Sequence, residues 1–357
     1  MRPRAEAAGP TERMLLVNWS HRYAGPLGGD AGILGQLMDS REKLAILPTP
    51  LHRAPRLSAA IGTEVWLKRD DLNGVALGGN KLRKLELLAA DARRHGADTL
   101  VTVGAPQSNH ARTVAAVAAM LGMDCDLILG GPRPAEPEGS LVLDLIFGAR
   151  LHFAGTTEWA ELERAAGDVA AEAASRGAHP YLMPTGGSVP LGAAAFAAAY
   201  AELREQCRAE GLRPAAIVHA SASAGTQAGL EIGRKMHADA DVTIIGIDVA
   251  KITGSLAGEV GRLAAQTARL LRVSEPTTPP QVLDGYMGAG YSIPSAGGNR
   301  ALRLLAATEG IITDPVYSAK ALHAVCEEQV AGPLVFWHTG GIPAVFSAES
   351  GLAAWPS

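Results

Sequence analysis

The sequence predicts an α/β protein whose open, twisted, mostly parallel sheets carry helices on both faces. Short runs rich in Val, Ile and Leu, typical of buried strands, recur along the chain. Longer segments with helical periodicity separate these runs and are long enough to serve as crossovers. The Ala-rich segments carry their charges on one side, so we expect ordinary packed helices. Strands joined by helical crossovers form parallel sheets that are covered on both faces.

The expected elements alternate in order along the chain. Apolar runs predict strands at residues 65–71, 98–104, 124–131, 150–155, 179–184, 215–221, 242–250 and 333–337. Helical periodicity predicts helices at residues 81–96, 111–122, 141–148, 158–177, 192–211 and 226–237. Gly96 and Gly122 end two of these helices, a common position for glycine. Residues 1–45 are rich in Gly, Pro and charge, and we expect an extension that is partly flexible or packed on a neighbouring subunit.

The composition is that of an ordinary globular protein. The chain has 357 residues, of which 47% are hydrophobic and 19% charged, and a net charge of -4. Without a long basic block, nucleic acid or an anionic membrane is not an expected partner. No apolar run reaches the roughly 18 residues of a membrane helix, and no signal peptide is expected. Three widely spaced cysteines without a C-x-x-C pair indicate reduced thiols and a cytoplasmic protein.

Ligands in open parallel sheets bind beyond the carboxyl ends of the strands, so the loops there should carry the chemistry. The first such loop, "LGGNKLRK", nearly spells a phosphate-binding P-loop, but Lys81 comes one residue late. Burial and the positive end of a helix would both favour a neutral, nucleophilic amine at Lys81. The alternative is a solvated helix lysine, the interpretation that we expect to hold for Arg83 and Lys84.

A second loop, "GAPQSNHART", follows the strand at 98–104. Gln107, Ser108, Asn109 and His110 crowd the turn into the next helix. One of these side chains can serve as a helix cap, but a cap does not need four polar groups in a row. The turn is therefore a candidate binding site.

Two further loops are rich in small residues. "SASAGTQAG" follows the strand at 215–221 and offers hydroxyl groups and the free N–H groups of a helix start to a phosphate. "FWHTGGIP" places Thr339 at the end of the last strand. In Gly- and Pro-rich loops, Tyr291 and Tyr317 are candidates for proton transfer or hydrogen bonding, although such tyrosines often only pack.

Several motifs are absent from the sequence. There is no G-x-G-x-x-G, no G-x-S-x-G and no His/Cys/Asp cluster with metal-ligand spacing, so no metal is expected. One lysine together with a phosphate cradle on an α/β scaffold fits a cofactor that has an aldehyde and a phosphate. Pyridoxal 5'-phosphate has both groups and stabilises a carbanion.

Two longer motifs carry a resemblance to a known family. "LKRDDLNGVALGGNKLRKLE" and "GAPQSNHAR" resemble the pyridoxal-phosphate-dependent 1-aminocyclopropane-1-carboxylate (ACC) deaminases and D-cysteine desulfhydrases, which have fold type II (tryptophan synthase β-like). The resemblance runs from about Pro48 to Phe346. We then expect a large cofactor-binding domain from residues 46–84 and 199–357, a small inserted α/β domain at 85–198, and a homodimer.

The resemblance also implies roles for individual residues. Lys81 would bind the cofactor aldehyde and move the substrate's α-proton, Asn80 would lie beside it, and Asn109 would hydrogen-bond the ring oxygen. Ser108, with its neighbours Gln107 and His110, would contact the substrate, and Tyr291 and Tyr317 would flank it. The phosphate would be bound by Ser223, Ala224, Gly225 and Thr226, and Thr339 would lie near the ring nitrogen. The family usually has glycine where Ala224 stands, and alanine favours a negative φ.

The expected activity is β-elimination from a small amino acid, with D-cysteine giving pyruvate, ammonia and sulfide. His110 and Thr339 resemble the desulfhydrases, whereas Ser295 and Ala296 depart from both branches. A threonine cannot keep the ring nitrogen protonated as a carboxylate would, which suits a substrate with a good leaving group. The alternatives are an ACC deaminase, a lyase for cysteate, D-serine or a specialised biosynthetic substrate, and a pyridoxal-phosphate-binding protein without turnover.

Overall fold

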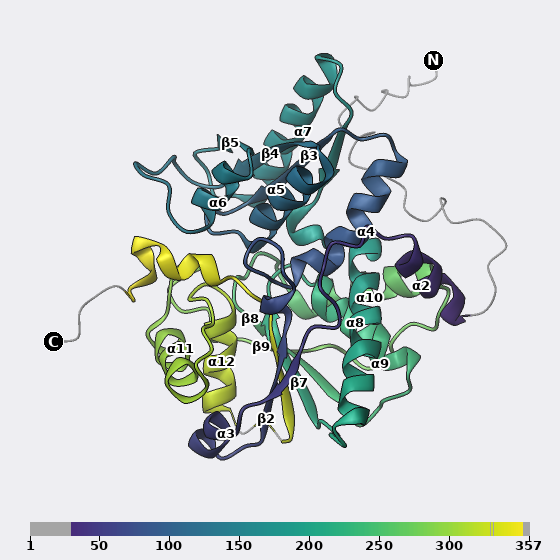
Figure 1. The fold of residues 1–357 in the computed structure, drawn as a ribbon, viewed down its shortest axis with the longest axis vertical. Coiled ribbons are helices and arrows are strands. Elements are labelled where there is room, and N and C mark those ends of the chain that lie inside the picture. Colours follow the sequence, from purple (N-terminus) through teal and green to yellow (C-terminus); the bar gives the residue numbers. More distant parts are fainter. Residues whose placement is uncertain (1–29, 329, 331, 353–357) are drawn as a thin grey trace, which may run out of the picture.

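The computed structural model describes residues 30–328, 330 and 332–352. Two twisted sheets form the centre of the fold, and helices cover both faces of each sheet (Figure 1). The four-stranded sheet lies at the top of Figure 1, above the six-stranded sheet. The predicted α/β class with two mostly parallel sheets is confirmed.

The larger sheet has the strand order β1-β2-β10-β7-β8-β9. All of its pairs are parallel except the pair of β1 with β2 at one edge. Its strands are β1 (Leu51–Arg53), β2 (Val65–Arg69), β7 (Ala216–Ser221), β8 (Thr243–Asp248), β9 (Gln281–Leu283) and β10 (Leu334–His338). The central strands are buried along their length, as expected for a sheet with two covered faces.

The smaller sheet is wholly parallel and has the order β5-β4-β3-β6. Its strands are β3 (Thr99–Gly104), β4 (Asp124–Leu129), β5 (Arg150–Phe153) and β6 (Pro180–Met183). All four lie inside the range 85–198 expected for an inserted domain, while both ends of the chain contribute to the larger sheet. The division into domains itself stays a prediction.

Helices cover both faces of the larger sheet, and each face has its own hydrophobic core. The helices are α2 (Asp30–Asp39), α3 (Pro55–Ile61), α4 (Lys81–Arg94), α5 (Asn109–Leu121), α6 (Ser140–Ile146), α7 (Trp159–Ser175), α8 (Pro190–Ala209), α9 (Gly225–Met236), α10 (Leu256–Leu271), α11 (Ala296–Glu309) and α12 (Ser318–Glu327). Figure 1 shows α11 and α12 on one side of the larger sheet and α8 and α9 on the other. Buried Phe336 packs toward α12, while its neighbour Trp337 packs on Phe196 of α8.

One expectation for the N-terminal segment is corrected. Residues 1–29 lie outside the described residues, but residues 30–45 are not a loose extension. Helix α2 buries Ile33 and Leu37 in the core of its own chain. The backbone N–H groups of Leu44 and Ala45 both donate to the buried carboxylate of Glu86, at 2.8 Å each. The apolar positions of α2 were too few to indicate this packing from the sequence.

The strand ends converge on one region. The loops after β3, β7 and β10 follow the carboxyl ends of parallel strands, where such sheets bind ligands. The loop before α4 joins them through a bridge between Gly79 and Gly340. No helix in the described part of the chain is long and apolar enough to span a membrane.

Candidate active site

A cavity lies where these loops meet. The predicted site residues that line it are Asn80, Lys81, Ser108, Asn109, His110, Ser223, Ala224, Thr226, Tyr291, Tyr317 and Thr339. Among the described residues that line the cavity, none is acidic. The four loops singled out in the sequence therefore share one site.

Lys81 is the first residue of α4, is half-buried and lines the cavity. Burial lowers the pKa of its amine to about 8, so a larger fraction is neutral near physiological pH than for an exposed lysine. Gly186 faces it across the cavity, and a Cβ on Gly186 would lie 3.4 Å from Lys81 Nζ. The side chain is half-buried and not fully buried, and its role as a nucleophile stays a prediction.

The loop between β7 and α9 forms one wall of the cavity. Asn80 Nδ2 donates to Thr226 Oγ1 at 3.0 Å, which leaves the Thr226 hydroxyl hydrogen free to donate. Helix α9 begins at Gly225, so its first N–H groups lack partners within the helix. Ala224 has φ 67°, the conformation that glycine favours, in place of the negative φ expected for alanine. The backbone of this loop is therefore strained at Ala224.

Lys84 and Arg83 are not solvated, which corrects the expectation from the sequence. Both side chains are buried, because α4 packs between α5 and α8. Lys84 Nζ donates to Gly186 O at 3.1 Å and to Ser188 Oγ at 3.3 Å. No carboxylate lies within ion-pair distance of Lys84 in the described ranges. Burial, and then the charge of Lys81, hold its pKa well below the usual value.

Lys84 also lies against the start of α9. A Cβ on Gly225 would be 2.6 Å from Lys84 Nζ, so only glycine admits the amine there. An ammonium at the positive end of a helix is unfavourable unless an anion joins them. Sequence reasoning missed Lys84, although its position three residues after Lys81 places both on one side of the helix.

Ser108 and Asn109 lie at the start of α5. Ser108 is the N-cap, and its Oγ accepts from Ala111 N at 3.2 Å, which leaves the hydroxyl hydrogen free. Asn109 Nδ2 donates to Thr339 O at 3.0 Å. Gly104 lets this turn pack closely on β3, since a Cβ there would lie 2.6 Å from Ser108 Cβ.

His110 is buried and neutral. Thr102 Oγ1 donates to Met183 O at 2.9 Å, so toward His110 Nε2, at 3.1 Å, it must accept. His110 therefore carries its proton on Nε2, and Nδ1 is an acceptor without a partner in the described residues. Burial, together with the charges of Lys81 and Lys84, holds the pKa of His110 well below its usual value.

The cavity lining does not include four positions singled out in the sequence, namely Gln107, Gly225, Ser295 and Ala296. Gln107 Nε2 donates to Glu138 O at 3.1 Å and its Oε1 accepts from Ser140 N at 2.9 Å, so this amide holds the start of α6. Ser295 caps α11 by accepting from Gly298 N at 3.0 Å, and Ala296 is the first residue of that helix. The departure from the family pattern at residues 295 and 296 thus falls on a helix cap.

An aromatic group covers another side of the cavity. Tyr291 Oη and Tyr317 Oη are 2.5 Å apart. Burial raises the pKa of Tyr291 to about 12 and that of Tyr317 well above 10, so both are protonated. Trp159, the first residue of α7, packs on Tyr291 with ring centroids 5.8 Å apart. Sequence reasoning missed Trp159, which no motif distinguishes from a packing residue.

The donor set fits pyridoxal 5'-phosphate. A buried lysine, the start of α9 and two small hydroxyl residues, Ser223 and Thr226, suit a phosphate. Lys81 can bind an aldehyde a short distance away, and the Asn109 amide is a donor for a ring oxygen. Within the described residues, no group of three His, Cys, Asp or Glu side chains could hold a metal ion.

The comparison with known proteins defines the class. A family model described as "Pyridoxal-phosphate dependent enzyme" matches residues 42–340. The chain therefore belongs to the pyridoxal-phosphate-dependent enzyme family, and the expected cofactor is confirmed.

More similar relatives narrow the resemblance. D-cysteine desulfhydrase of Salmonella choleraesuis (strain SC-B67) is 41% identical over 321 residues, which cover 86% of this chain and 95% of the relative. The corresponding protein of Salmonella schwarzengrund (strain CVM19633) is 40% identical with the same coverage. A solved ACC deaminase homologue is 34% identical with a TM-score of 0.83, covering 89% of this chain and 98% of its own. The resemblance to these two groups of enzymes is confirmed.

The fold is shared more widely. A solved threonine deaminase from T.th. matches with a TM-score of 0.66 at 20% identity, covering 87% of this chain and 97% of its own. At this identity, the likeness is one of fold alone.

Proposed function

We propose that this protein is a pyridoxal-phosphate-dependent lyase that eliminates the β-substituent of a small amino acid, with D-cysteine as substrate and pyruvate, ammonia and sulfide as products. The observation that carries the proposal is the Lys81 amine, with a pKa of about 8, in a cavity lined by donors and no carboxylate. The desulfhydrase relatives support the choice of substrate.

When bound, the cofactor supplies an electron sink that stabilises negative charge at the substrate's Cα. Lys81 Nζ would hold the cofactor through its aldehyde, and the same amine would accept the proton from the substrate's Cα. A neutral amine is needed for both steps, and burial provides it. The thiolate then leaves from Cβ.

The phosphate is held by Lys84, the first N–H groups of α9, and the hydroxyls of Ser223 and Thr226. These groups bring positive charge and donors to one place, and the buried Lys84 gains a counter-charge. Asn109 donates to the ring oxygen. Thr339, which lines the cavity, would offer the ring nitrogen only a hydroxyl.

Ser108 and the first N–H groups of α5 bind the substrate carboxylate. The Ser108 hydroxyl hydrogen is free because its oxygen already accepts from Ala111 N. Tyr291 and Tyr317 remain protonated and serve as donors at the other end of the substrate. The contact of Trp159 with Tyr291 joins α7 to the segment between β9 and α11 at the cavity, where both side chains are lining residues and would limit the entry of water.

The direct test incubates cofactor-loaded protein with D-cysteine and measures pyruvate and sulfide together. The proposal predicts equimolar release, and loss of both activity and the long-wavelength absorption of bound cofactor in Lys81→Ala. A matched control is Lys235→Ala, an exposed lysine in the last turn of α9, which should keep both. Turnover by Lys81→Ala at the wild-type rate would reject the assigned role.

A second candidate is deamination of ACC, which the structural likeness to an ACC deaminase homologue favours. Release of ammonia and a four-carbon oxo acid from ACC, without sulfide from D-cysteine, would select it. Cysteate and D-serine test other β-substituted substrates. If no amino acid changes the cofactor spectrum, the protein binds the cofactor without turnover.

Assembly and location complete the proposal. We infer a homodimer that works in the cytoplasm, supported by the family resemblance and by three free cysteines, of which Cys125 and Cys207 are buried. Light scattering at micromolar concentration tests the dimer, and a monomer mass would reject it.

A further inference from the structure

Arg112 is a buried arginine without an ion pair. It lies on α5, one turn after Asn109, and its side chain is fully enclosed. Its Nη2 donates to Gly78 O at 3.0 Å and to Asn109 Oδ1. Neither Nε nor Nη1 has a hydrogen-bond partner, and no carboxylate lies within 4 Å, in the part of the chain that the structure describes. Burying an unpaired charge costs free energy, so the contacts of Arg112 should indicate its role.

The contact with Arg112 decides which way the Asn109 amide faces. A guanidinium can only donate, so the atom that meets it must be the amide oxygen. On the other side, Nδ2 donates to the carbonyl oxygen of Thr339, which can only accept. If the amide turned over, an NH₂ would face a guanidinium and an oxygen would face a carbonyl. Both contacts would become repulsive.

This orientation matters at the cavity. Asn109 lines it, and Nδ2 carries a second hydrogen beyond the one donated to Thr339. The fit is close, since a Cβ on Gly79 would lie 2.8 Å from Asn109 Nδ2. The same guanidinium holds Gly78 O, in the glycine loop that precedes Lys81. Arg112 therefore ties the loop that carries the lysine to the helix that carries the amide.

We propose that Arg112 is a positioning residue that fixes the Asn109 carboxamide with its NH₂ group toward the cavity, as a donor to the cofactor's ring oxygen. This inference rests on the proposed function, in which Asn109 also donates to the cofactor's ring oxygen. Arg112 acts on the ring oxygen through Asn109 alone, while its contact with Gly78 O anchors the glycine loop.

The charges around Arg112 agree with this role. Burial lowers the pKa of Arg112 to about 10, while Asp144, Asp314 and Tyr317 act to raise it. Asp144, on α6, is buried, and neither of its oxygens has a hydrogen-bond partner in the described residues. Burial raises the pKa of Asp144 to about 8, so its carboxyl group is largely protonated near pH 7, and Arg112 Nη2 keeps Gly78 O and Asn109 Oδ1 as its hydrogen-bond partners.

The test compares two buried arginines. Arg112→Met removes the donor, whereas Arg83→Met removes an arginine whose partners, Asp70, Glu202 and Thr49, lie outside the cavity lining. The readout is the ratio of the two absorption bands of bound cofactor across pH, which reports whether the ring oxygen is protonated. Loss of an N–H donor should shift this ratio toward the protonated form by about fivefold, the factor equivalent to one net hydrogen bond. Arg83→Met should lower the melting temperature and leave the ratio unchanged.

Two further variants keep the inference testable if Arg112→Met does not fold. Arg112→Lys keeps the positive charge and one hydrogen-bond donor. Its band ratio should therefore lie between those of Arg112→Met and the wild type. In an Asn109→Ala background, Arg112→Lys should change the ratio no further, because Arg112 acts through Asn109. A wild-type ratio in a folded Arg112 variant, or an additive shift in the double variant, would overturn the inference.

The readout also separates the two proposals. Wild-type protein that binds no pyridoxal phosphate would reject the proposed function and this inference together. Normal binding and turnover, with an unchanged band ratio in Arg112→Met and Arg112→Lys, would reject the positioning role alone.

Discussion

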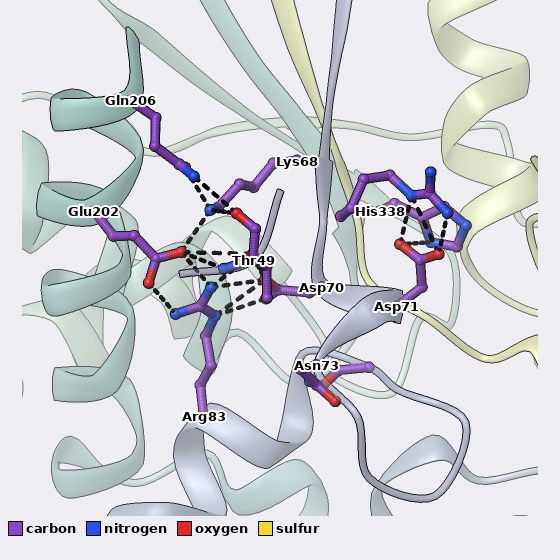
Figure 2. A network of polar contacts seen from close by, with 11 residues as sticks. Thr49, Lys68, Asp70, Asp71, Asn73, Arg83, Glu202, Gln206 and His338 are labelled. Atoms are coloured by element: carbon purple, nitrogen blue, oxygen red, sulfur yellow. Dashed lines mark hydrogen bonds and ion pairs between the residues drawn. The ribbon is translucent and has the colours of Figure 1, made fainter. Parts of the chain in front are cut away.

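Helix α4 serves two buried charged clusters that differ in how their charges are balanced. On one side, Arg83 joins a network with Lys68, Asp70 and Glu202, in which two cations meet two carboxylates (Figure 2). On the other side, Lys81 lines a cavity without an acidic lining residue among those described, and the buried Lys84 lies behind its wall, where it donates to Gly186 O and Ser188 Oγ. The charges of the first cluster are balanced within the chain. The positive charges of the second cluster are not, and a bound anion would balance them.

The distances in the network show how fully it is satisfied. Arg83 Nη2 lies 2.9 Å from Asp70 Oδ1 and Nη1 lies 3.0 Å from Glu202 Oε2. Lys68 Nζ donates to Thr49 O at 2.6 Å and contacts Glu202 Oε1 at 2.5 Å. Burial opposes ionisation of Glu202, but Arg83 and Lys68 outweigh it and lower the pKa of Glu202 to about 2. Buried charge paired in this way holds the fold, whereas unpaired charge is available to a ligand.

The largest expected effect comes from breaking the network. Glu202→Gln removes one carboxylate and leaves two buried cations with one, so the free energy of unfolding should fall by about 3–5 kcal/mol. Chemical denaturation of the cofactor-free protein measures it. Glu205→Gln, on the same helix in the exposed pair with Arg208, is the control and should change nothing measurable. Equal stability of the two variants would contradict the comparison.

Removing a cation from the cavity should act with the opposite sign. Lys84→Met relieves a buried charge, so the cofactor-free protein should be as stable as wild type or more stable. Cofactor affinity should fall about 10- to 100-fold, the equivalent of one charge-assisted hydrogen bond. Equilibrium dialysis measures this, with Lys235→Met as the control. If Lys84→Met unfolds the protein and leaves affinity intact, Lys84 belongs to the fold and not to the site.

The two clusters should also differ in the pH range over which they change stability. Glu202 has a folded pKa of about 2 against a usual 4.5, so its contribution is present above pH 4.5 and is lost as pH falls toward 2. Lys81 has a folded pKa of about 8 against a usual 10.5, so the unfolded chain binds more protons between these values. The contribution of Lys81 to the stability of the cofactor-free protein should therefore rise across pH 8–10.5, by at most about 3 kcal/mol.

Denaturation at a series of pH values tests this assignment. Lys81→Met should flatten the alkaline rise only in part, because Lys320 also has a pKa lowered to about 8 by burial. Glu202→Gln should flatten only the acid limb. An alkaline rise that is unchanged in Lys81→Met would show that the Lys81 amine is not perturbed.

The smallest effect concerns the strained wall of the cavity. Ala224→Gly removes a side chain at φ 67°, so stability should rise by about 0.5–1 kcal/mol. Thermal unfolding measures the change. Ala228→Gly, inside α9, is the matched control and should destabilise by about 1 kcal/mol. A loss in both variants would mean that Ala224 stores no strain.

The sequence was sufficient to predict the strands and helices that have a regular local pattern of apolar residues. Apolar runs and helical periodicity located every strand of the smaller sheet and the loops that meet at the cavity. The edge strands β1 and β9 were missed because each has only three residues and little burial. Helices α10, α11 and α12 were also not predicted; α11 and α12 pack together on one side of the larger sheet, whereas α10 packs against α8 and α9.

For the site, the sequence identified residue types but not what surrounds them. Lys81 stood out because it follows two glycines, while Lys84 looked like a solvated charge. Burial of Lys84 depends on α8 packing on α4 and on Gly225 of a distant loop, which no local pattern shows. Gln107 and Ser108 are neighbours, yet the turn directs one amide to α6 and one hydroxyl to the cavity.

The most direct measurement is to reduce the cofactor-loaded protein with borohydride and map the modified lysine by mass spectrometry. The account predicts one pyridoxyl phosphate per chain, attached at Lys81, with Lys84 unmodified. Attachment at Lys68 would contradict the division into a network side and a cofactor side, and attachment at Lys84 or Lys320 would contradict the assignment of the aldehyde to Lys81.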